Sequence, residues 1–127
     1  MGYRFDTQAW PVVCFEFFGR LSADELTQYF ADSDALMKRA EPYAAVMDAS
    51  DMLVPEVEIV RKQALWLREN GAKLASVNRG IALVIRSSVI RGLVRAVIHF
   101  QEIPVAYEWF SDRDEAMSWA SARATSG

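Results

Sequence analysis

Two carboxylates, Asp48 and Asp51, have the spacing and the position at which this chain could bind a metal ion. They follow an apolar run at residues 43–47 that predicts a strand, and open α/β sheets bind ligands at the carboxyl ends of their strands. Two carboxylates with added waters could hold Mg²⁺. However, the companion groups of a receiver-type phosphorylation site are not visible, and Ile85-Arg86 ends the neighbouring strand instead. We therefore favour turn and helix-capping roles for both aspartates and expect no metal.

The single histidine, His99, offers a second possibility for chemistry. At helical spacing it shares a face with Ser88 and Glu102, as a Ser-His-Glu relay would require. Ser88 lies three turns from His99, too far along the axis for a hydrogen bond, so a solvated polar face is the favoured interpretation. The sequence contains no glycine-rich phosphate loop and no HExxH or CxxC motif. We expect neither an enzyme nor a bound cofactor.

Cys14 is the only cysteine, so the chain can form no internal disulfide and no thiolate metal cluster. It lies among apolar residues, where a small buried hydrophobe is the favoured interpretation.

The elements that must position these residues alternate between strands and helices. Ser22 and Glu25 form a capping box that begins a helix running to about Ala40. Pro55 begins a second helix, for which Asn70-Gly71 supplies a stop signal. A third helix begins at Ser87 or Ser88 and reaches about residue 100, and a fourth begins at Ser111 or Asp112. The expected strands cover residues 3–8, 12–18, 43–47, 81–85 and 105–110.

This order predicts an α/β fold in one domain over residues 1–123, followed by a frayed tail at 124–127. Strands joined through helices make right-handed crossovers and a mostly parallel sheet. An N-terminal β-hairpin adds one antiparallel strand. The expected architecture is a five-stranded mixed sheet with four helices.

The pattern resembles the STAS or SpoIIAA-like fold of anti-sigma-factor antagonists, and within it the bacterial STAS/SEC14-like branch. The resemblance covers nearly the whole chain and implies a small non-enzymatic domain that works by binding partners. Its carriers are Gly19-Arg20-Leu21-Ser22, the strand ending Val46-Met47-Asp48, and the closing segment Phe110-Ser111-Asp112-Arg113-Asp114-Glu115-Ala116-Met117-Ser118-Trp119.

One departure from the family pattern is informative. The antagonists place an Asp-Ser-Ser-Gly motif with a phosphorylatable serine where the third strand meets the second helix. This chain reads Asp48-Ala49-Ser50-Asp51 followed by Met52-Leu53-Val54-Pro55 there, without a Ser-Gly pair. The phosphorylation switch is therefore not carried over to this sequence.

The third helix has more apolar surface than one sheet face needs. Its apolar residues cover an arc of roughly 200° at 100° per residue, against a little over 100° for a helix on a sheet. The surplus would be covered by a neighbouring helix, a second subunit or an apolar ligand. Gly92, in mid-helix, hints at a close approach by another backbone or a ligand. Trp66 and Ile59 fall off the apolar stripe of the second helix, which makes Trp66 a candidate surface contact.

The net charge of −3 hides an uneven distribution. Residues 1–58 carry a net charge of −7, residues 59–101 carry +7, and residues 102–127 carry −3. We interpret the basic residues between 61 and 95 as solvated helix faces and expect no nucleic-acid partner. The sequence has no apolar run long enough to span a bilayer and no apolar signal core, which favours a cytoplasmic location.

Two hypotheses for function follow. The first is a non-catalytic regulatory or protein-interaction module that forms a homodimer, and the alternative is the binding of an apolar or lipid-like ligand, as in SEC14-like carriers or sensors. A cavity between the third helix and the sheet would favour the ligand, and a flat paired apolar patch would favour the module. The candidate contact residues for either hypothesis are Asp48, Asp51, Trp66, Arg91, Gly92, Val94, Arg95 and Ile98.

Overall fold

The five strands lie side by side in the same order as they occur along the chain, in a computed structural model that describes residues 2–125. β1 is antiparallel to β2, and every later strand is parallel to the one before it. The predicted mixed sheet with an N-terminal hairpin and four helices is thereby confirmed. The strands are β1 (Tyr3–Asp6), β2 (Val12–Gly19), β3 (Tyr43–Met52), β4 (Asn78–Val84) and β5 (Tyr107–Phe110).

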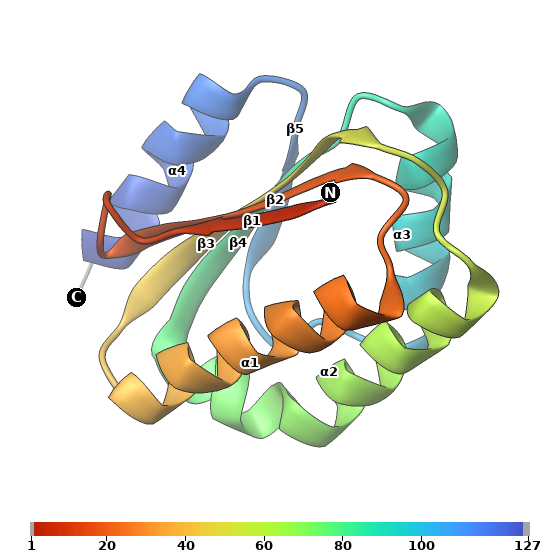
Figure 1. Cartoon of the computed structure of the whole chain (residues 1–127). Coiled ribbons are helices and arrows are strands. Elements are labelled where there is room, and N and C mark those ends of the chain that lie inside the picture. Colours follow the sequence, from red (N-terminus) through yellow and green to blue (C-terminus); the bar gives the residue numbers. More distant parts are fainter. Residues whose placement is uncertain (1, 126–127) are drawn as a thin grey trace.

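The helices are divided unequally between the two faces of the sheet. α1 (Ala23–Arg39), α2 (Val57–Val77) and α3 (Ser88–Phe100) cover one face, and α4 (Arg113–Thr125) covers the other (Figure 1). The strand order explains this division, because three successive right-handed crossovers that advance in one direction place their helices on the same face. No helix within residues 2–125 has the length and apolar character needed to cross a membrane.

Side-chain caps begin three of the helices where the sequence predicts them. The capping box of α1 is complete, since Glu25 N donates to Ser22 Oγ at 3.2 Å and Ser22 N donates to Glu25 Oε1 at 2.9 Å. Ser87 Oγ accepts from Ile90 N at 3.2 Å, which selects Ser87 over Ser88 as the cap of α3. Asp112 Oδ2 accepts from Glu115 N at 3.2 Å at the start of α4.

The predicted end of α2 at Asn70-Gly71 is wrong, because the helix continues to Val77. Leu74 and Val77 are both buried in the last two turns. A helical glycine costs about 1 kcal/mol relative to alanine. Burying two aliphatic side chains contributes roughly 3 kcal/mol or more, which outweighs that cost.

Other boundaries also differ from prediction. α2 begins at Val57 rather than at Pro55, and β1, β4 and β5 cover Tyr3–Asp6, Asn78–Val84 and Tyr107–Phe110. β3 continues past Asp48 to Met52, because Asp48 and Asp51 still pair with β2 across a register shift. α4 continues through Thr125 and so includes the first two residues of the predicted frayed tail. The rest of that tail, residues 126–127, lies outside the described residues.

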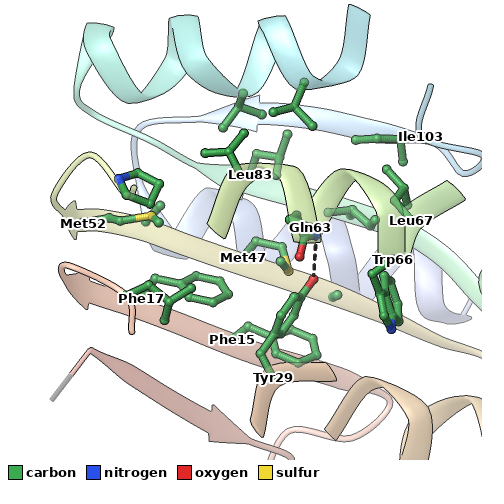
Figure 2. A pocket seen from close by; sticks show the side chains of 18 of the residues that line it. Phe15, Phe17, Tyr29, Met47, Met52, Gln63, Trp66, Leu67, Leu83 and Ile103 are labelled. Carbon is green, nitrogen blue, oxygen red and sulfur yellow. Dashed lines mark hydrogen bonds between the residues drawn. The ribbon is translucent and has the colours of Figure 1, made fainter. Parts of the chain in front are cut away.

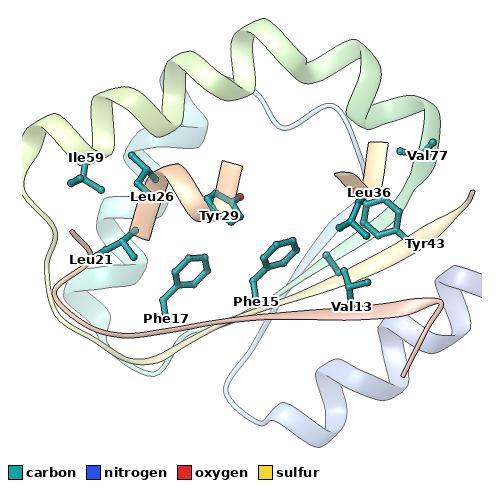
Figure 3. Close-up of a cluster of buried hydrophobic side chains, with 11 residues drawn as sticks. Val13, Phe15, Phe17, Leu21, Leu26, Tyr29, Leu36, Tyr43, Ile59 and Val77 are labelled. Carbon is teal, nitrogen blue, oxygen red and sulfur yellow. The ribbon is translucent and has the colours of Figure 1, made fainter. Parts of the chain in front are cut away.

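The alternation of side chains along the strands divides the core into two layers. On the three-helix face, Phe15 and Phe17 of β2 pack against Leu26 and Tyr29 of α1 (Figure 3). On the opposite face small side chains predominate and bring α4 close to the sheet; that cluster consists of Val12, Cys14, Ala44, Val46, Ala82, Val84, Ala116 and Ala120. Cys14 is buried there as a small hydrophobe, as predicted.

Candidate functional site: an apolar cavity under three helices

A cavity of about 210 Å³ lies between the sheet and the three helices α1, α2 and α3. Its floor is formed by residues of β2, β3 and β4, and its walls by side chains of the helices (Figure 2). α3 contributes Ile90, Leu93, Val94, Val97 and Ile98. The sequence identified such a cavity as the feature that would favour a ligand.

Met47 shows that this space is incompletely filled. It lies in the middle of the central strand on the three-helix face, where a side chain is normally inaccessible to solvent. Met47 is nevertheless only half-buried and faces the cavity (Figure 2). Of the α3 side chains that line the cavity, only Ile90 is fully buried. The loose cover provided by α3 therefore leaves room over β3.

The described residues that line the cavity include no charged side chain. Most are aliphatic or aromatic, and the polar ones are Tyr29, Ser33, Tyr43, Gln63 and Asn78. Moving an isolated charge from water into such a site is strongly unfavourable. A molecule that binds here must therefore bury apolar surface and leave any charge outside.

Gln63 and Tyr29 form the polar feature of the cavity wall. Gln63 Nε2 donates to Tyr29 Oη at 3.3 Å, and both side chains point into the space beside Met47 (Figure 2). The second polar atom of the amide, Gln63 Oε1, is buried and has no hydrogen-bond partner within residues 2–125. An unpaired buried acceptor costs roughly 1–3 kcal/mol, so this oxygen is available to a donor from outside the chain.

Tyr29 remains uncharged at any physiological pH. Burial raises the pKa of Tyr29 to about 12, although the hydrogen bond with Gln63 acts in the opposite direction. The aromatic rings of Phe15, Phe17 and Trp66 surround it at centroid distances of 5.2, 5.4 and 6.3 Å. Its hydroxyl is thus a neutral, fixed hydrogen-bonding group.

Three of the eight predicted contact residues line this cavity, namely Trp66, Val94 and Ile98. The expectation that Trp66 and Ile59 lie at the surface is wrong, since both are buried. The Trp66 ring stacks on Phe30 of α1 at 5.4 Å with an interplanar angle of 4°. α2 packs against α1 as well as the sheet, which requires a wider apolar arc than contact with the sheet alone.

Asp48 lies away from the cavity and holds a structural cluster near α4. Its Oδ1 accepts from Ser50 N at 3.0 Å and from Ser50 Oγ at 2.6 Å, and its Oδ2 accepts from Arg113 at 3.2 Å. Arg113 Nη1 also lies 3.6 Å from Glu16 Oε2. Asp51, the other predicted contact residue on this strand, is exposed. Within residues 2–125, no group of three or more His, Cys, Asp and Glu side chains is arranged to hold a metal.

Replacement of Asp48 by asparagine is expected to lower the free energy of unfolding by about 1–3 kcal/mol. The neutral amide weakens the contact with Arg113 and loses one acceptor oxygen. Chemical denaturation of the variant measures this change. Because the role is structural, Mg²⁺ or EDTA should leave the unfolding temperature of the unmodified protein unchanged. A rise of several degrees with Mg²⁺ alone would contradict this assignment.

The remaining predicted contacts, Arg91, Gly92 and Arg95, lie outside the cavity lining. Arg91 donates to the carbonyl of Ile85 at 3.0 Å, and Arg95 lies over the Trp109 ring at 5.5 Å. The expectation that another backbone segment of this chain approaches Gly92 closely is wrong. A Cβ at Gly92 would meet no atom within 4 Å.

Ser88 and His99, the two residues considered for a relay, do not meet. Ser88 and His99 lie near opposite ends of α3, and both are exposed. The His99 ring instead contacts the neighbouring ring of Phe100 at 5.6 Å.

Gln63, Tyr29 and Met47 line the cavity but were not predicted from the sequence as site residues. A signal was present for Gln63, because it lies three and four residues from Val60 and Leu67 on the apolar stripe of α2. A polar side chain on a core-facing stripe is the unusual feature. No sequence signal distinguished Met47 from other core residues.

Comparison with known proteins identifies a known fold of the same type. No protein-family model and no curated protein sequence matches the chain. A solved structure, an uncharacterized protein of the DUF3478 family with a SpoIIAA-like fold from Shewanella loihica PV-4, is similar with a TM-score of 0.69 and 13% identity. The match covers 93% of this chain and 91% of that one. With the strand order and helix placement above, the similarity shows that this chain has the SpoIIAA-like fold.

Proposed function

We propose that this protein is a non-catalytic binding protein for a small apolar molecule, which occupies the cavity between α3 and the sheet. The observation that carries the proposal is an uncharged cavity of about 210 Å³ in contact with the central strand. Ligand sites in proteins are typically concave and mostly apolar, with a few placed polar groups. This cavity has that composition, with Gln63 and Tyr29 among its few polar groups.

The volume limits the ligand. An engineered apolar cavity of roughly 150 Å³ binds benzene, which has six non-hydrogen atoms, and drug-sized ligands occupy sites of about 300 Å³ or more. In proportion, about 210 Å³ holds roughly eight non-hydrogen atoms. A long acyl chain exceeds this volume, so the proposed ligand is smaller than the lipids suggested by the SEC14-like resemblance.

Methionine-methyl NMR provides a direct test, because the chain carries its own control. Met47 and Met52 line the cavity, whereas Met117 belongs to α4 and packs on the opposite face of the sheet. Toluene added to ¹³C-methyl-methionine protein should shift the Met47 and Met52 signals through its ring current and leave Met117 unchanged. Equal shifts at all three methyls, or none, would contradict the proposal.

A matched pair of α3 variants tests whether the cavity itself binds the probe. Val94 is half-buried and lines the cavity, whereas Val89 on the same helix is 63% exposed. Val94→Trp should place an indole in the cavity and weaken toluene binding at least tenfold. Val89→Trp should leave the affinity unchanged. Circular dichroism and thermal melting establish that both variants are folded.

We also propose self-association, favoured by a second observation on α3. Its outer surface exposes Val89 and Phe100, which is 86% exposed, with the small residues Gly92 and Ala96 between them. These four positions lie within about 80° of one another around the helix. The small residues would allow another helix to approach closely, and the exposed phenylalanine would supply apolar surface to bury. Symmetric dimers are the most common oligomers.

Sedimentation equilibrium at tens of micromolar is expected to show a dimer for the unmodified chain. Phe100→Glu should give a folded monomer, because the side chain is exposed in the single chain and its loss removes no core contact. The control is Leu65→Glu, which changes an exposed leucine on α2 and should leave the dimer intact. A monomeric unmodified protein would refute this second proposal without affecting the first.

A further inference from the structure

We propose that the ligand is a neutral molecule with a single hydroxyl group, which donates a hydrogen bond to Gln63 Oε1. This inference rests on the proposed ligand cavity and specifies the chemistry that it selects. It follows from the unpaired oxygen of Gln63, the position of its amide beside Tyr29 and the absence of charge among the described residues of the lining.

The orientation of the Gln63 amide determines which group is needed. Gln63 Nε2 already donates to Tyr29 Oη, so the unpaired atom of this amide, Oε1, is an acceptor. At Gln63 Oε1, a ligand group that can only accept, such as an ether or ketone oxygen, would place a second oxygen against the amide oxygen and leave both unpaired. A hydroxyl supplies the missing proton, and the hydrogen bond replaces the bond that the ligand gives up to water.

The lining determines the charge of the ligand. A carboxylate, phosphate or ammonium group at Gln63 would be buried among residues such as Met47, Trp66 and Leu67 with no opposite charge beside it. The two arginines of α3, Arg91 and Arg95, do not line the cavity. Arg91 donates through Nη2 to Ile85 O, although its buried Nε has no partner within residues 2–125, and Arg95 lies over the Trp109 ring. The ligand is therefore a neutral alcohol or phenol of roughly eight non-hydrogen atoms.

Two isomers test this selection. p-Cresol and anisole are isomers with the same number of non-hydrogen atoms, but only p-cresol carries a hydrogen-bond donor. Their dissociation constants can be measured by titrating the Met47 methyl signal. p-Cresol should bind the unmodified protein about tenfold more tightly than anisole. Benzylammonium, which also has eight non-hydrogen atoms but is cationic at neutral pH, should bind at least 100-fold more weakly than p-cresol.

The variant Gln63→Leu should abolish the preference, reducing the ratio of the two constants from about ten to about one while toluene still binds. This change removes the Gln63 partner of Tyr29 Oη, leaving only Ser33 beside that hydroxyl, and could disturb folding. The double variant Tyr29→Phe/Gln63→Leu removes both polar groups together, and such paired replacements are often nearly neutral. It should fold, bind toluene and show no preference for p-cresol.

The outcomes separate this inference from the proposal on which it rests. If toluene fails to shift Met47 and Met52 in the unmodified protein, the proposed ligand cavity is wrong. If toluene binds but anisole binds as well as p-cresol, the cavity stands and the hydroxyl selection is wrong. A preference for p-cresol that survives in Gln63→Leu would also overturn it, since the donor would then be recognised by another group.

Discussion

Trp66→Glu is expected to lower the free energy of unfolding by at least about 4 kcal/mol and to leave the chain largely unfolded. Trp66 is only 9% exposed, and its ring stacks on Phe30. Truncating a buried tryptophan alone costs roughly 3–5 kcal/mol. The glutamate would add an unpaired carboxylate in apolar surroundings, which is a further large cost.

The neighbouring residue provides the control for this prediction. Leu65 precedes Trp66 on α2 and is 50% exposed, so Leu65→Glu should change the free energy of unfolding by less than about 1 kcal/mol. Far-ultraviolet circular dichroism and denaturant titration compare the two variants. A folded Trp66→Glu protein with altered oligomeric state would place Trp66 in an interface and contradict its position in the core.

Gly80→Val is expected to cost about 2–3 kcal/mol, although valine is the better strand residue. A Cβ at Gly80 would lie 3.0 Å from Trp119 Cη2 and 3.2 Å from Arg123 Cγ. These atoms belong to α4, which packs closely on β4 because small side chains separate them. Valine would push the helix away from the sheet or force Trp119 from its position.

A double-mutant cycle establishes the cause of that cost. If the Trp119 ring is the obstacle, Gly80→Val and Trp119→Leu together should cost about 1–2 kcal/mol less than the sum of the two single changes. Gly92→Ala, made in the monomeric Phe100→Glu background, serves as the opposite control, since its Cβ meets open space in the single chain and alanine should stabilise the helix by about 0.5–1 kcal/mol. Strict additivity in the cycle would show that α4 adjusts freely and that close packing does not explain Gly80.

The proposed cavity and the Asp48 cluster occupy opposite faces of the same strand. Met47 faces the three helices, whereas Asp48 faces α4 and bonds with Arg113. Substitutions at Asp48 should therefore change stability with little effect on ligand binding, and those at Gln63 should change ligand preference. Binding and stability measured on both variants would separate a structural role from a functional one.

Local signals in the sequence were sufficient to predict most of the fold. The capping box of Ser22 and Glu25 and the caps before α3 and α4 were predicted because each depends on residues within one helical turn. Alternating residue types predicted the strand at β2, and the alternation of strands with helices along the chain predicted a mixed, mostly parallel sheet. The stop at Gly71 was wrong because burial of Leu74 and Val77 against the sheet outweighed a local preference.

Only the tertiary structure decided the site. The cavity is a space that side chains from β2, β3, α1, α2 and α3 leave unfilled. Residue types alone do not reveal such a gap between elements that are distant in the sequence. The strand order placed three helices on one face, which buried Trp66 and Ile59 and left α3 as a loose cover. The same arrangement brought Gln63 to Tyr29 with one amide oxygen unpaired, because hydrogen-bond pairing depends on positions in space that the order of residues does not specify.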